Sequence, residues 1–157
     1  ESLQSDGHMY ELVIADGQFL PFRESSFDAI VCIRTLKYFP DYQLGIKEMS
    51  RVLKLDGRLV LSLSNVFSLD PFLRKIGVLA YKTLFRFKNM RDIFLRNSLV
   101  PLDHVGLHKV HPQVWVWFQS SKVLSILKVV EYTLQKLTPK EFLSREILVK
   151  LTKKDKL

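Results

Sequence analysis

The feature that most constrains the fold is a strand–helix–strand pattern between residues 27 and 63. Phe27–Ile33 is an apolar run rich in β-branched residues, which predicts a strand buried on both faces. A helix is expected to begin after Asp41, a plausible N-cap, and to stop at Gly57. Arg58–Leu63 is the next apolar run. Two strands joined by a helix form a βαβ unit, so the pattern predicts a parallel sheet with a right-handed crossover.

The regions on either side are expected to add further elements. Leu12–Ala15 predicts a short buried strand that ends in an Asp-Gly turn. Apolar residues at helical spacing predict an amphipathic helix over Pro71–Lys88, and residues 89–111 are expected to be a loop or broken helix. Pro112 suits the first turn of a helix, although Val114–Phe118 would equally suit a strand.

The C-terminal region is expected to complete the sheet. Ile126–Leu134 and Arg145–Leu151 are apolar runs joined by a turn at Thr138-Pro139 and a short link, which predicts an antiparallel pair. The expected architecture is one α/β domain over residues 1–157, with a parallel sheet that has a terminal antiparallel pair.

Composition excludes several classes of protein. The chain has 157 residues, of which 47% are apolar and 25% charged, so it is neither disordered nor collagen-like. No apolar run approaches the roughly 18 residues of a membrane-spanning helix. The polar first ten residues predict no signal peptide, and a single cysteine excludes an internal disulfide framework. A cytoplasmic location is expected.

The net charge of +8 is unevenly distributed. Residues 1–70 hold seven Lys/Arg against ten Asp/Glu, residues 71–109 hold eight against two, and residues 110–157 hold nine against four. A basic second half indicates a surface that faces an anion, a membrane or nucleic acid, or simply a solvated basic surface.

Residues 13–65 carry a specific motif: VIADGQFLPFRESSFDAIVCIRTLKYFPDYQLGIKEMSRVLKLDGRLVLSLSN. This stretch resembles the middle of class I S-adenosylmethionine (SAM)-dependent methyltransferases of the small-molecule "type 11" group, whose fold is Rossmann-like. The resemblance implies SAM as cofactor and a small-molecule or lipid acceptor. The matching positions are Asp16-Gly17, Leu20-Pro21-Phe22, Ser26-Phe27-Asp28, Pro40-Asp41, Glu48, Arg51-Val52-Leu53-Lys54, Gly57 and Asn65.

The same resemblance implies where the adenine of the cofactor would bind. Asp16 matches the residue that accepts a hydrogen bond from the adenine amino group, and the Gly17 amide matches the one that donates to the ring. Gln18 and Phe19 could flank the ring. The alternative is an ordinary Asp-Gly turn after a strand.

A second group of candidate residues follows the Phe27 strand. Ile33, Arg34 and Thr35 match the turn that lines the methionine part of SAM, at the carboxyl edge where open α/β sheets bind ligands. Arg34 could meet a carboxylate or stay exposed. Cys32 is interpreted as a small buried hydrophobe rather than a nucleophile.

Three departures from the family pattern concern the cofactor site. The glycine-rich loop that approaches the methionine end of SAM is absent, since no two of the six glycines lie close enough to form it. Tyr38 stands where the family often has His, and Leu55-Asp56-Gly57 replaces Pro-Gly-Gly. The resemblance implies that two strands normally precede Leu12 and pair beside it. The chain is therefore expected to be the C-terminal two-thirds of a methyltransferase fold, truncated at its N-terminus, inactive alone and with exposed apolar edges.

Other polar groups have simpler interpretations. Glu48 and Arg51, three residues apart on one helix, are interpreted as a surface ion pair. His104, His108 and His111 are interpreted as loop histidines, with a general base or a metal site as alternatives. No metal site is therefore predicted.

The basic residues of the second half leave the function open between two classes. A helical basic insertion over residues 70–111 is expected to shape the substrate pocket, and its helix could also pack in the core or contact a membrane surface. Nucleic acid is a further possible partner for Arg74, Lys75, Lys82, Arg86, Lys88, Arg91 and Arg96. The rival to the enzyme is a non-catalytic, degenerate methyltransferase fold that binds a membrane, a nucleic acid or a protein.

Overall fold

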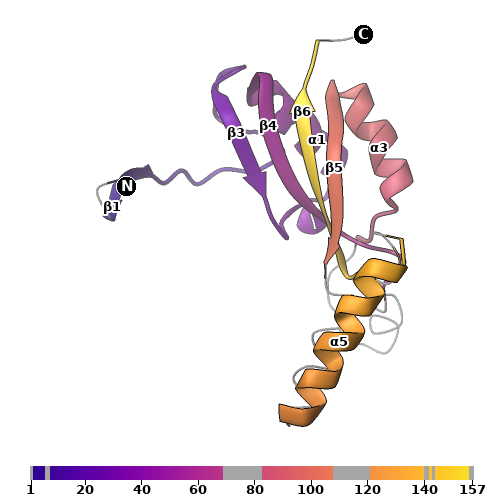
Figure 1. The fold of residues 1–157 in the computed structure, drawn as a ribbon. Coiled ribbons are helices and arrows are strands. Elements are labelled where there is room, and N and C mark those ends of the chain that lie inside the picture. Colours follow the sequence, from indigo (N-terminus) through magenta and orange to yellow (C-terminus); the bar gives the residue numbers. More distant parts are fainter. Residues whose placement is uncertain are drawn as a thin grey trace.

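A computed structural model describes residues 2–5, 8–68, 83–107, 121–139, 142 and 144–155. Its main feature is a four-stranded sheet in the order β3-β4-β6-β5 (Figure 1). β3 and β4 are parallel, and β6 runs antiparallel to both of its neighbours, β4 and β5. The elements of this sheet and its helices are β3 (Phe27–Cys32), η1 (Leu36–Tyr38), α1 (Tyr42–Val52), β4 (Leu53–Ser64), α3 (Phe87–Arg96), β5 (Leu99–Leu107), α5 (Ser121–Leu137) and β6 (Glu146–Lys153).

The predicted βαβ unit is confirmed as β3-α1-β4. The Asp41 carboxylate accepts hydrogen bonds from the backbone N–H groups of Gln43 and Leu44, which makes Asp41 the N-cap of α1. The backbone then turns at Asp56, which has a φ of 58°. Asp tolerates this left-handed conformation better than most residues, so it can stand where the family pattern has a glycine.

The core lies on one face of the sheet. Leu59, Leu61 and Leu63 of β4 are fully buried because alternate residues of a strand point to the same face. Side chains from α1 and α3 belong to the same cluster, among them Ile46 and Phe94. The helices are tied together where the Ser50 hydroxyl donates to the Asn97 carbonyl at 2.6 Å.

The prediction that the Phe27 strand, β3, is buried on both faces is wrong. β3 lies at the edge of the sheet, and the Val31 side chain on its outer face is 70% exposed. Ile30 and Cys32 point to the core instead. Burial on both faces requires cover on both faces, and the described residues put their helix-lined core on only one.

The predicted strand at Leu12–Ala15 is wrong. These residues form no strand and pair with no described strand, and Leu12, Val13 and Ile14 are exposed. An antiparallel hairpin of β1 (Ser2–Ser5) and β2 (His8–Glu11) precedes them and stands apart from the main sheet (Figure 1). An apolar run becomes a strand only when a neighbour satisfies its backbone groups, and none of the described strands lies beside it.

The second half also corrects the sequence-based expectations. Ile126–Leu134 is part of α5, so the predicted strand there is wrong; a short apolar run does not by itself distinguish a strand from a helix. The expected loop over 89–111 instead contains most of α3 and all of β5, so part of the expected helical insertion is a strand of the main sheet. The antiparallel pair exists, and β5 is the partner of β6 in it.

Several predictions fall on residues that the structure does not describe. Residues 71–82 of the predicted amphipathic helix lie outside the described ranges, and its last described part begins a helix only at Phe87. The predicted Pro112 helix, up to residue 120, lies outside them too. Among the described residues, no helix is long and apolar enough to span a membrane.

Candidate functional site

The turn that begins at Asp16 is closed by its own polar groups. The Asp16 Oδ1 atom accepts a hydrogen bond from the Gln18 backbone N–H at 2.9 Å, and the Phe19 N–H donates to the Asp16 carbonyl at 3.0 Å. The Gln18 side chain is buried and its Oε1 accepts from the Asp41 N–H at 2.7 Å. The turn is therefore attached to the start of α1, while the Asp16 side chain stays exposed.

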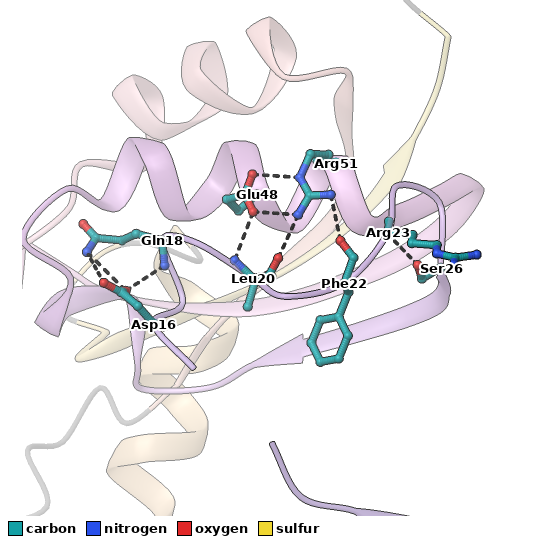
Figure 2. A network of polar contacts seen from close by, with 8 residues as sticks. All are labelled: Asp16, Gln18, Leu20, Phe22, Arg23, Ser26, Glu48 and Arg51. Atoms are coloured by element: carbon teal, nitrogen blue, oxygen red, sulfur yellow. Dashed lines mark hydrogen bonds and ion pairs between the residues drawn. The ribbon is translucent and has the colours of Figure 1, made fainter. Parts of the chain in front are cut away.

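Glu48 and Arg51 of α1 hold the segment that follows this turn (Figure 2). The Glu48 Oε2 atom accepts from the Leu20 N–H at 3.0 Å, and Arg51 donates to the carbonyls of Leu20 and Phe22 at 2.9 and 2.8 Å. The two side chains also pair with each other at 2.8 Å. The predicted ion pair is thus confirmed. It is more than a surface pair, because both side chains also bind the backbone of the Leu20-Pro21-Phe22 motif.

This network has an electrostatic consequence. The hydrogen bond from Arg51, with a smaller contribution from the Leu20 N–H, holds the pKa of the Glu48 carboxyl below its ordinary value of 4.5, against the opposing effect of burial. The same hydrogen bond raises the pKa of Arg51 above its ordinary value. Both groups therefore keep their charges at neutral pH, and the segment stays anchored.

Two glycines pack against the Phe39 ring beside the turn. A Cβ atom added at Gly17 would lie 2.2 Å from the Phe39 Cζ atom, and one added at Gly45 would lie 2.4 Å from its Cδ2 atom. Real Cβ atoms do not approach other atoms so closely. The glycine of the Asp16-Gly17 pair is therefore required by packing as well as by any contact with a ligand.

The second candidate group lies at the carboxyl end of β3. Arg34 has a φ of 58°, and its backbone N–H donates to the Ser62 hydroxyl at 2.7 Å. Its Nε atom is 3.0 Å from the Oε1 atom of Glu146, the first residue of β6. Ile33 is exposed, and the Thr35 hydroxyl donates to the Ile33 carbonyl at 3.0 Å. Both alternatives for Arg34 describe it, since its side chain is exposed and also contacts a carboxylate of the chain itself.

The two groups meet through the segment between β3 and α1. Gly17 contacts Phe39 and Gln18 binds Asp41, so the first turn packs on the chain that leads away from Arg34. Sequence reasoning missed Phe39, Lys37 and Glu146 as parts of this region. No local sequence motif predicts their place in this region, since Lys37 lies in the short helix η1 and Glu146 is far away in the sequence.

The remaining candidate residues are Cys32 and the three histidines. Burial raises the pKa of the Cys32 thiol above its ordinary value, as expected for a small residue in the core. His104 lies on β5, and its ring stacks on Phe87 with centroids 4.3 Å apart. His108 and His111 lie outside the described residues. Within the described part of the chain, no three His, Cys, Asp or Glu residues group as a metal site would require.

Comparison with known proteins links this geometry to a family. Residues 1–61 match the family model described as "Methyltransferase domain". Over 50 residues the chain is 44% identical to demethylmenaquinone methyltransferase of Corynebacterium glutamicum. Over 50 residues it is 42% identical to sterol 4-C-methyltransferase of Caenorhabditis elegans. Each stretch covers 32% of this chain, but only 22% of the bacterial and 15% of the nematode protein.

The fold is similar to that of solved methyltransferases. A SAM-dependent methyltransferase of Thermotoga maritima, described as a possible histamine N-methyltransferase, superposes with a TM-score of 0.60 at 19% identity, over 89% of this chain and 62% of that one. At this identity the likeness concerns the fold. Residues 1–61 therefore match a methyltransferase family model, and the described residues share the fold of solved SAM-dependent methyltransferases.

Proposed function

We propose that this chain forms part of an enzyme that transfers a methyl group from SAM to a small-molecule or lipid acceptor. The observation that carries the proposal is the Asp16–Phe19 turn, which Gln18 attaches to the start of α1. The segment that follows the turn is held by Glu48 and Arg51. An exposed carboxylate beside a glycine offers an acceptor and a backbone donor to one edge of a purine ring. The turn therefore fits the adenine end of the cofactor.

The proposal assigns this chain a binding and orienting role. Asp16 and Gly17 would hold the adenine, with Gln18 and Phe19 beside the ring, and the turn of Ile33, Arg34 and Thr35 would border the methionine end. When bound, SAM supplies an electrophilic methyl group on a sulfonium sulfur. Such transfer is accelerated largely by proximity and alignment, and a base is needed only when the acceptor must lose a proton.

The acceptor class is proposed from the relatives. The similar bacterial protein is named for demethylmenaquinone and the nematode protein for a sterol, and both of these are lipids. Helix α5 leaves Ile126, Val129 and Leu137 exposed, with Lys122 and Lys136 on the same helix. An apolar stripe with lysines suits the surface of an anionic membrane, where lipid acceptors lie. Co-sedimentation with vesicles of anionic and of neutral lipid tests this part.

The test of the cofactor site is a titration of the ¹⁵N-labelled chain with S-adenosylhomocysteine, followed by NMR. We expect saturable shifts of the Gly17, Gln18 and Phe19 amides. The change Asp16→Ala should weaken binding by about tenfold or more, the worth of one hydrogen bond to a charged group. Asp28→Ala is the matched control, since Asp28 is an exposed carboxylate that pairs with Lys54.

Three results would contradict this assignment. The first is a folded chain, verified by circular dichroism, whose turn amides do not shift at millimolar ligand. The second is an Asp16→Ala variant that binds as well as the unmodified chain. The third is an Asp28→Ala variant that loses affinity to the same extent as Asp16→Ala.

A further inference from the structure

A groove of about 280 Å³ lies between helix α3 and strand β5, at the edge of the sheet opposite to β3 (Figure 1). Its α3 wall is formed by Phe87, Arg91 and Leu95, and its β5 wall by residues 100–104. Pockets that hold a drug-sized molecule measure about 300–1,000 Å³, so this groove suits a few side chains rather than a large cofactor.

The groove is elongated, because a helix and a strand run along its two sides. Phe87, Arg91 and Leu95 are four residues apart, so they lie on one side of α3 and span about 12 Å at the helical rise. The Phe87 ring stacks on the His104 ring with centroids 4.3 Å apart. Arg91 therefore lies midway between an aromatic and an aliphatic residue of the same wall.

Both walls of the groove expose apolar surface. Leu95 on α3 is 47% exposed, and Leu102 on β5 is 48% exposed. Neighbouring exposed apolar side chains that line one groove are typical of a binding surface, because a ligand that covers them removes apolar area from water. An occupant of the groove is thus expected to carry apolar groups.

The charges around the groove favour an acidic occupant. Helix α3 carries more basic than acidic residues: Lys88, Arg91 and Arg96 against Asp92. Within the described part of the chain, the Arg91 guanidinium makes no hydrogen bond or ion pair, and its side chain is exposed. Asp103 also lines the groove, but it accepts the His104 backbone N–H at 2.8 Å and lies opposite Lys150 in the sheet. A carboxylate beside Arg91 would be attracted by this guanidinium and could pair with it in a bidentate manner.

We propose that this groove docks an extended acidic segment of a partner protein. An acidic residue of the segment pairs with Arg91, and the apolar residues two positions before and after it contact the two ends of the groove. Alternate residues of an extended chain point to the same side, and three such residues span roughly 13 Å, which matches the length of the α3 wall. The candidate cofactor residues lie on the β3 side of the sheet, so this inference goes beyond the proposed function and does not depend on it.

The partner is expected to bind through side chains rather than by adding a strand to the sheet. Pro101 has no backbone N–H, and the register between β5 and β6 shifts beside it. Both features interrupt the hydrogen-bonding edge of β5. The side-chain groove therefore carries the specificity of the proposed contact.

The experiment titrates the ¹⁵N-labelled chain with the blocked pentapeptide Phe-Thr-Glu-Thr-Leu and with its reverse, Leu-Thr-Glu-Thr-Phe, followed by NMR. We expect saturable shifts of the Arg91, Leu102 and His104 amides with at least one direction. Replacing the glutamate of that peptide by glutamine should weaken binding by about tenfold, the worth of one hydrogen bond to a charged group. Moving the glutamate by one position places it on the other side of the extended peptide and should have the same effect.

Variants of the chain test the pairing with Arg91. Arg91→Gln should lower the affinity for the acidic peptide by about tenfold and leave that for the glutamine peptide unchanged. Arg96→Gln is the matched control, since Arg96 is an exposed cation of the same helix that does not line the groove. Arg91→Glu should reject the acidic peptide and bind its lysine counterpart, an exchange that a general loss of structure would not produce. Circular dichroism verifies that each variant is folded.

Four results would overturn the inference: no shift of the groove amides at millimolar peptide, equal affinity for the glutamate and glutamine peptides, an equal loss in Arg96→Gln, or no exchange of preference in Arg91→Glu. Octanoate is the probe for a small apolar anion. If it saturates the same amides with the affinity of the acidic peptide, the groove belongs to a small amphiphile and the peptide assignment is wrong. Because S-adenosylhomocysteine is absent from these titrations, a failure of the adenine site at Asp16 is read separately.

Discussion

The Gly17–Phe39 contact allows a sharp test of the packing that supports the candidate cofactor site. In Gly17→Ala, the new methyl group would start 2.2 Å from the Phe39 Cζ atom and 2.9 Å from its Cε2 atom. The same ring packs closely on a second glycine, since a Cβ added at Gly45 would lie 2.5 Å from the Cε2 atom. Overpacking of this kind costs about 1–3 kcal/mol.

Two smaller effects adjust this cost. Alanine restricts the unfolded chain more than glycine does, and this stabilises Gly17→Ala by about 0.4–1 kcal/mol. The expected net loss in the free energy of unfolding is therefore about 1–2 kcal/mol. Gly45 lies inside α1, where alanine is favoured over glycine by about 1 kcal/mol. We therefore expect Gly45→Ala to be the milder of the two substitutions.

The measurement is urea unfolding followed by far-ultraviolet circular dichroism, with each glycine variant made alone and combined with Phe39→Leu. Removing the ring should remove most of the penalty of Gly17→Ala, so the double variant should lose far less than the sum of the two changes. The reasoning is refuted if Gly17→Ala is as stable as the unmodified chain. It is also refuted if the penalty persists in the Phe39→Leu background.

Three further predictions concern stability. The pKa of the Glu48 carboxyl is lowered in the folded chain, so this group stabilises the fold above its ordinary pKa of 4.5, and the stabilisation is lost as pH falls through the lowered pKa. We therefore expect the urea midpoint of Glu48→Gln to decline less than that of the unmodified chain between neutral and acidic pH. An equal decline in the two proteins would contradict this. Asp41→Ala removes the N-cap of α1 and should cost about 1 kcal/mol in thermal unfolding, whereas Asp41→Asn should restore most of it. Leu61→Ala should cost about 2–5 kcal/mol, because the side chain is fully buried in β4, and a loss below 1 kcal/mol would contradict the described core.

The predictions from the sequence succeeded where the structure depends on local contacts and failed where it depends on contacts between distant residues. The β3-α1-β4 unit was predictable because its signals are local: a β-branched run, an Asp N-cap and a helical period each act within a few residues. The candidate turn at Asp16 was predictable for the same reason, through a motif that is continuous in the sequence.

The two wrong strand predictions also share one physical cause, which is dependence on neighbouring elements. Leu12–Ala15 is apolar enough for a strand, but a strand forms only with a neighbour to accept its hydrogen bonds. Ile126–Leu134 has the composition of a strand or of a buried helix, and the choice of helix depends on length and surroundings rather than on the run itself.

The sequence alone determined the family motif, the parallel unit and the positions of the candidate adenine contacts. Only the tertiary structure decided that Glu48 and Arg51 clamp the Leu20–Phe22 segment, and that Glu146 meets Arg34 at the carboxyl edge of the sheet. These contacts join residues far apart in the chain. Charge and hydrogen bonding act through space, so a pattern along the sequence carries no signal for them until the strands are placed side by side.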